Sequence, residues 1–220
     1  MTAETKVTAR PAPLEITHPQ CEAYYEDLTV RLRSTGYGHA IFRRGVLSSL
    51  ITCLRLHVCE SAMDSAEAGK DRDRDVDGIL SRMAEGISSP EVAVHVLKCA
   101  EYVQAWKDLS EVKLPRPGPF PITVDTSEEE FSELYDTLRK CVSIPVLIRK
   151  DVVVEDFYTF LIQDLCDAAI CSCEKKDMPV ESIIGCLEEV IPETDREDLR
   201  DYLKTTIAYI HSHHFEGTVH

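Results

Sequence analysis

The sequence predicts an all-α protein made of two helical halves joined by a proline-rich extended linker. Three observations support this prediction. Apolar residues recur at intervals of three and four over most of the chain, capping signals precede several of these stretches, and alternating prolines interrupt the pattern near the middle. We expect about three helices in each half. A short strand or an extended segment is the alternative near 144–154, where SIPVLIRKDVVV is apolar, β-branched and interrupted by Pro145.

The composition is that of an ordinary globular protein with a strongly acidic surface. The 220 residues are 44% hydrophobic and 29% charged, and 24 basic against 39 acidic side chains give a formal charge of −15. Because nucleic-acid affinity depends on neutralising phosphates with Lys and Arg, we expect no binding to DNA or RNA. No apolar run is long enough to span a bilayer, so direct membrane insertion is not expected. Short basic clusters are interpreted as solvated helix faces, namely Arg43, Arg44 and Arg55, and residues 139–140.

The nine cysteines are odd in number and irregularly spaced, and most fall in apolar helical stretches. A free Cys in such a stretch behaves as a small hydrophobe, so no disulfides are expected. Cys166, Cys171 and Cys173 lack the spacing of a structural zinc site, and helical periodicity puts Cys171 on the opposite side from the other two. The first residues, MTAETKVTARPAP, do not resemble a signal peptide. We therefore expect a reducing intracellular compartment, the cytoplasm first, with the mitochondrial matrix or cilium as alternatives.

The N-terminal half is predicted at 21–113, after an extended arm at 1–20 that contains three prolines. The strongest helix in this half is RGVLSSLITCLRLHVCESAM, which places a row of aliphatic side chains on one face. VDGILSRMAEGI should form a shorter helix. The next helix should start after Ser89, with Pro90 at its first position and Ser88 and Glu91 as a capping box.

The linker is predicted at 114–125, where four prolines alternate in LPRPGPFPITVD. Alternating prolines hold the backbone near polyproline II, so we interpret this stretch as a stiff spacer. A docking ligand for an SH3-like groove is the alternative, but that class needs prolines three positions apart. The C-terminal half follows at 126–210, with capping boxes beginning at Thr126 and Thr194, and a polar tail containing HSHH ends the chain at 211–220.

The two halves contain a similar pattern of residues. VDGILSRMAEGI and VESIIGCLEEVI are each followed by a proline and then by a capped helix, and each comes after an apolar, cysteine-bearing helix and a charged loop. A duplication explains this pattern, and so does coincidence, because any two amphipathic helices share a 3.6-residue period. The matched pairs are Val76/Val180, Ile79/Ile183, Leu80/Ile184, Met83/Leu187 and Ile87/Ile191.

DRDRDVDGIL at 71–80 partly resembles a calcium-binding loop. Counting from Asp73, Asp75 and Asp77 occupy the third and fifth ligand positions and a glycine follows, as the helix–loop–helix motif requires. The twelfth position is Ala84, and the first glutamate, Glu85, comes one residue late. We therefore interpret the stretch as an acidic linker whose last aspartates start the next helix. A degenerate calcium site at 73–85 is the alternative.

The sequence contains no glycine-rich phosphate loop, nucleophile elbow or zinc-protease motif, and no cofactor or catalytic residue is predicted. We expect a non-enzymatic protein–protein interaction or scaffold subunit whose partners are other proteins of a multiprotein complex. Aromatic and Arg side chains dominate interface energetics, so the candidate contacts are Tyr24, Tyr25, Arg43 and Trp106. The alternatives are a calcium-responsive protein, or a helical enzyme or small-ligand carrier with its pocket between the two halves, lined by groups such as His57 or His95. These two histidines are otherwise interpreted as hydrogen-bonded structural residues.

Overall fold

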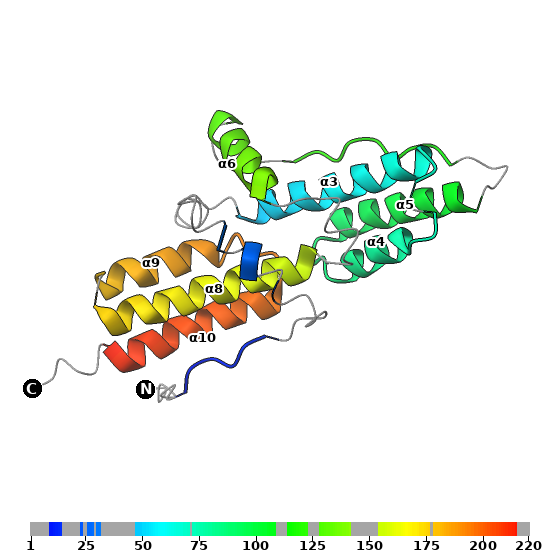
Figure 1. Ribbon diagram of the computed structural model, residues 1–220. Coiled ribbons are helices and arrows are strands. Elements are labelled where there is room, and N and C mark those ends of the chain that lie inside the picture. Colours follow the sequence, from blue (N-terminus) through cyan, green and yellow to red (C-terminus); the bar gives the residue numbers. More distant parts are fainter. Residues whose placement is uncertain are drawn as a thin grey trace, which may run out of the picture.

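A computed structural model describes residues 9–14, 23, 26–28, 30–31, 47–70, 72–108, 114–122, 128–141, 154–176 and 178–214. Most of these residues are helical and none of them forms a strand, which confirms the predicted all-α fold (Figure 1). The alternative of a strand near 144–154 lies outside the described residues, except that Val154 is the first residue of a helix. Among the described residues, no helix is both long and apolar enough to cross a membrane.

Six of the helices pack as two groups of three. Helices α3 (Leu47–Glu67), α4 (Val76–Glu85) and α5 (Pro90–Lys107) form the N-terminal trio. Helices α8 (Val154–Lys175), α9 (Val180–Val190) and α10 (Glu197–His214) form the C-terminal trio, and α6 (Glu128–Cys141) contacts α3 (Figure 1). Each trio has a long, a short and a long helix, the order that the internal similarity predicts, and its third helix contacts the other two.

Two of the predicted capping boxes can be compared with the structure. At α5, Pro90 is the first helical residue, as predicted, but the capping box of Ser88 and Glu91 is wrong. The cap is Ser89, whose Oγ accepts a hydrogen bond from the backbone N–H of Val92 at 3.5 Å. Thr194 does not cap α10, because its buried hydroxyl donates to the carbonyl of Val190 at 2.8 Å and the helix starts at Glu197. The box at Thr126 lies outside the described residues. Because α10 continues to His214, residues 211–214 are helical and do not belong to the predicted polar tail.

One hydrophobic cluster extends through both trios. Phe157 on α8 and Leu203 on α10 are fully buried in it, as are Cys166 and Cys173, while Cys171 is only half-buried. Burial raises the pKa of the Cys166 thiol to about 12, so this side chain stays protonated and packs as a small apolar group. The spacing of these cysteines therefore predicts their positions in the helix.

An ion-pair network crosses the core between the two trios. The side chain of Arg55 on α3 is 0% exposed, and its Nε and Nη2 donate to the carboxylate of Glu155 on α8, both at 2.6 Å. Its Nη1 donates to Asp195 at 2.9 Å. Burial acts to lower the pKa of Arg55, but the hydrogen bonds and charges of Glu155 and Asp195 outweigh burial and raise it. The interpretation of Arg55 as part of a solvated helix face is therefore wrong.

The described part of the predicted linker, residues 114–122, forms neither helix nor strand, and we call it the proline segment. It lies along the N-terminal trio (Figure 1), where Arg116 donates to Asp64 at 2.8 Å and to Glu67 at 2.7 Å on α3. The ring of Phe120 meets His95 of α5 edge-on, with centroids 5.4 Å apart. These contacts fasten the proline segment to the N-terminal trio, so it does more than space the halves apart.

Candidate functional site

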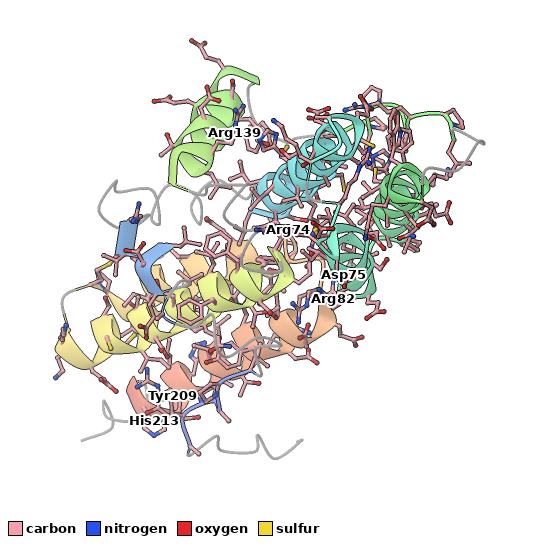
Figure 2. All side chains as sticks on the ribbon, turned by 45° about the vertical axis from the view of Figure 1, so that its right-hand side comes forward. Arg74, Asp75, Arg82, Arg139, Tyr209 and His213 are labelled. Atoms are coloured by element: carbon pink, nitrogen blue, oxygen red, sulfur yellow. The ribbon has the colours of Figure 1, made fainter. Side chains whose placement is uncertain are left out.

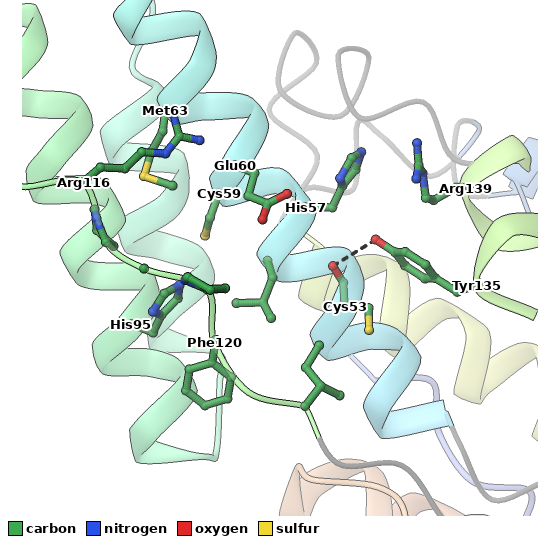
Figure 3. Close-up of a pocket in the computed structure, with 15 residues that line it drawn as sticks. Cys53, His57, Cys59, Glu60, Met63, His95, Arg116, Phe120, Tyr135 and Arg139 are labelled. Carbon is green, nitrogen blue, oxygen red and sulfur yellow. Dashed lines mark hydrogen bonds between the residues drawn. The ribbon is translucent and has the colours of Figure 1, made fainter. Parts of the chain in front are cut away.

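A cleft of about 400 Å³ lies between α3, α6 and the proline segment (Figure 3). One face of α3 forms its floor, because Cys53, Leu56, His57, Glu60 and Met63 follow the helical repeat and all line the cleft. The opposite face of α3 is buried in the core. The cleft thus follows from a helix that is covered by the core on one side and only partly covered on the other.

Helix α6 forms one wall of the cleft. Leu138 of α6 is buried, and the Tyr135 hydroxyl donates to the backbone carbonyl of Cys53 at 3.2 Å, which holds the helix against α3. Burial raises the pKa of Tyr135 to about 12, so its hydroxyl keeps the proton that this bond requires. Arg139, one turn further along α6, brings its side chain beside His57 (Figure 3).

The cleft is lined by two imidazoles and by three exposed charged side chains, of which Arg116 is paired with carboxylates of α3. Burial, together with the charge of Arg139, lowers the pKa of His57. Burial, together with the charge of Lys98, lowers the pKa of His95, so the neutral form of both imidazoles is favoured. Glu60 and Arg139 are exposed at the cleft, and neither side chain makes a hydrogen bond or an ion pair to another described residue. A ligand can therefore replace the water around these two side chains without breaking a side-chain hydrogen bond or ion pair to another described residue.

A thiol–imidazole contact lies behind the cleft. The Cys99 Sγ is 3.7 Å from Nε2 of His95, and a hydrogen bond from Cys59 lowers the pKa of Cys99. A Cys beside a His is the combination that nucleophilic enzymes use. Here, however, the Cys99 side chain is 0% exposed, so a substrate cannot reach its sulfur in this conformation. Cys99 is therefore not an accessible nucleophile at this cleft.

The three aspartates named as calcium ligands, Asp73, Asp75 and Asp77, have different surroundings in the structure. Asp73 is exposed, the carboxylate of Asp75 lies 3.3 Å from Nη1 of Arg82 (Figure 2), and that of Asp77 accepts a hydrogen bond from Lys107. Within the described ranges, no three His, Cys, Asp or Glu side chains form a group that could hold a metal ion. The alternative of a calcium site stays a prediction, which calorimetric titration with calcium tests when wild type is compared with Asp75→Ala.

Of the four predicted interface residues, the structure describes Trp106, which does not line the cleft. Trp106 is half-buried against the core, with its ring 6.3 Å from that of Tyr102. Tyr24, Tyr25 and Arg43 lie outside the described residues, so their part in an interface stays a prediction.

Sequence reasoning named two of the cleft residues, as examples for an alternative pocket between the two halves, and missed the others. His57 and His95 stand out as polar side chains within apolar helical stretches, and both line the cleft. Tyr135 and Arg139 belong to a distant helix whose placement against α3 has no local signal, and Glu60 resembles any exposed acidic residue. No protein-family model matches the chain, and no curated protein or solved structure is detectably similar to it, so proposals about its function depend on the geometry of the cleft.

Proposed function

We propose that this protein is a non-enzymatic interaction subunit of a larger assembly, and that a segment of a partner protein binds in the cleft. The observation that supports this most directly is the cleft itself, an open hollow of about 400 Å³ with walls fastened to α3. A pre-formed hollow with fixed walls lowers the cost of binding, because less of the protein must become ordered.

The lining of the cleft is suited to a polypeptide. Leu56 and Ile122 offer apolar surface for a side chain of the partner, and Ile122 is 37% exposed although it is a large hydrophobic residue. Glu60 and Arg139 offer opposite charges beside this apolar surface. An apolar centre bordered by polar groups, with Arg among them, is the usual composition of a protein–protein interface.

Panning a phage-displayed library of short random peptides against the purified protein tests this function. Peptides should be enriched on the wild-type protein, and Leu56→Arg should weaken their binding about tenfold or more, because a charged side chain would fill the floor of the cleft. Leu97→Arg is the matched control, since Leu97 is 43% exposed on α5 and does not line the cleft. No enrichment, or equal loss of binding in both variants with both folded by circular dichroism, would contradict the proposal.

A small-ligand carrier is a second candidate, and the cleft favours it through two features. Its volume of about 400 Å³ lies in the usual range for small-molecule sites, and His57 and His95 both line it. A thermal-shift screen of small organic acids and amines discriminates the two functions. Stabilisation of the wild-type protein that is lost in Leu56→Arg, with no enriched peptides, would favour the carrier.

A further inference from the structure

The charges at the cleft place chemical requirements on a bound segment. Arg139 projects from α6 (Figure 2) and lies next to His57 (Figure 3), while Glu60 lies on α3 one turn beyond His57. The other arginine of the cleft, Arg116, is already paired with two carboxylates of α3. Among the described residues that line the cleft, Arg139 is therefore the guanidinium that a ligand can use.

A carboxylate is the group that best fits Arg139. A guanidinium binds a carboxylate through two parallel N–H···O bonds, which are stronger than hydrogen bonds between neutral groups. The protein as a whole carries a formal charge of −15 and repels acidic segments over most of its surface. An acidic side chain is therefore attracted to this cation and disfavoured at most other positions.

The carboxylate of Glu60 favours a basic side chain in the bound segment, close to the acidic side chain that pairs with Arg139. Residues 57 and 60 are three positions apart on α3, which corresponds to about 4.5 Å along the helix axis. In an extended segment, side chains two positions apart lie on the same side and are separated by roughly 6.5 Å. An acidic side chain at Arg139 and a basic side chain two positions away can therefore reach both charges.

We propose that the bound segment carries an acidic side chain that pairs with Arg139, a nearby basic side chain that pairs with Glu60, and an apolar side chain against Leu56. This inference rests on the function proposed above and adds the chemistry of the partner segment. Two other polar side chains near these charges already have partners of their own. Asp64 is paired with Arg116, and the hydroxyl of Tyr135 is bonded to Cys53.

Charge reversal in the cleft tests the proposal with peptides selected on the wild-type protein. These peptides should share an acidic residue, and Arg139→Glu should weaken their binding about 10- to 100-fold, because a charged hydrogen-bonded pair becomes a repulsive one. Replacing that acidic residue by Lys in the peptide should restore binding to Arg139→Glu. Glu60→Arg should act in the same way on a basic residue of the peptide. Lys204→Glu, at an exposed site of α10, makes the same charge change outside the cleft and should have little effect.

The outcomes separate this inference from the function on which it rests. Peptides that depend on Leu56 but bind Arg139→Glu as well as they bind the wild type would overturn the charge pairing and leave the interaction function in place. Selected peptides without a shared acidic residue would do the same. A library that gives no binding peptide on the wild-type protein would overturn both.

Discussion

Arg55 Nε and Nη2 each lie 2.6 Å from a carboxylate oxygen of Glu155, a residue 100 positions further along the chain. The pair is buried, and it joins α3 of the N-terminal trio to α8 of the C-terminal trio. A third group, Asp195, binds the remaining side of the guanidinium. Two carboxylates thus share one buried cation at the junction of the two trios.

Removing the cation should destabilise the protein strongly. Arg55→Met leaves two carboxylates without their partner in the core, so the free energy of unfolding should fall by about 3–5 kcal/mol. The double variant Arg55→Met/Glu155→Met should lose less free energy of unfolding than the two single variants lose together. The reason is that the Glu155 carboxylate, which Arg55→Met leaves buried without its partner, is then also removed. Urea unfolding of the four proteins measures both quantities. Additive losses, or a loss below about 1 kcal/mol for Arg55→Met, would contradict the view that the pair joins the trios.

Gly86 leaves room for Glu155 to reach Arg55. A Cβ added at Gly86 would lie 2.7 Å from Cγ of Glu155, closer than real side chains approach one another. The φ angle of Gly86 is −83°, which suits any residue, so glycine is required here by the lack of space for a side chain and not by the backbone conformation. Gly86→Ala should therefore lower the free energy of unfolding by about 1–3 kcal/mol.

The matched control for this substitution is Gly185→Ala in α9. A Cβ at Gly185 meets no atom within 4 Å, and alanine favours the helix, so this variant should be up to about 1 kcal/mol more stable than wild type. Urea unfolding of both variants checks the opposite signs. An unchanged free energy of unfolding in Gly86→Ala would show that Glu155 can move aside without loss of stability.

Features that depend on neighbouring residues in the sequence could be predicted, and features that depend on distant ones could not. The fold class and the start of α5 at Pro90 follow from local periodicity and from the backbone preferences of proline. Thr194 matches the same capping pattern as other helix starts, but its hydroxyl bonds to the turn before it. A sequence pattern does not distinguish between these two hydrogen bonds.

The buried ion pair and the cleft depend on contacts between distant segments. Arg55 lies in an apolar stretch, and the carboxylates of Glu155 and Asp195, which reach it from distant segments, explain its burial. Likewise, Tyr135 meets Cys53 across 82 positions, and this contact sets the wall of the cleft. The alternating prolines predict an extended backbone but not the surface on which it lies. The polar lining of the cleft therefore required the structure.

Titration of His57 should make the protein less stable in mild acid. Its pKa lies below the ordinary value of 6.5 in the folded protein, so below neutral pH the unfolded chain binds a proton more readily than the folded one. The stability from a neutral His57 is complete above pH 6.5 and is lost as the pH falls through 6.5 to the folded pKa. The urea midpoint of His57→Gln should therefore decrease less between pH 7.5 and pH 5 than that of wild type. Parallel pH profiles for the two proteins would contradict this assignment.

Loss of Arg116 should affect binding more than stability. The side chains of Arg116, Asp64 and Glu67 are all more than a third exposed, and ion pairs between such groups contribute only about 0–1 kcal/mol each to stability. The same pairs hold the proline segment against α3, so in Arg116→Gln this wall must become ordered when a ligand binds. Affinity for cleft-binding peptides should fall about tenfold, while the free energy of unfolding changes by less than about 1–2 kcal/mol.

Fluorescence anisotropy with labelled peptides and urea unfolding measure the two effects of Arg116→Gln separately. Lys204→Gln is the control, because it removes an exposed ion pair with Asp201 on α10 and leaves the proline segment untouched. Unchanged affinity in Arg116→Gln would show that the wall holds its position without the ion pairs, through contacts such as that of Phe120 with His95. A loss of several kcal/mol in stability would instead show that the proline segment is part of the folded core.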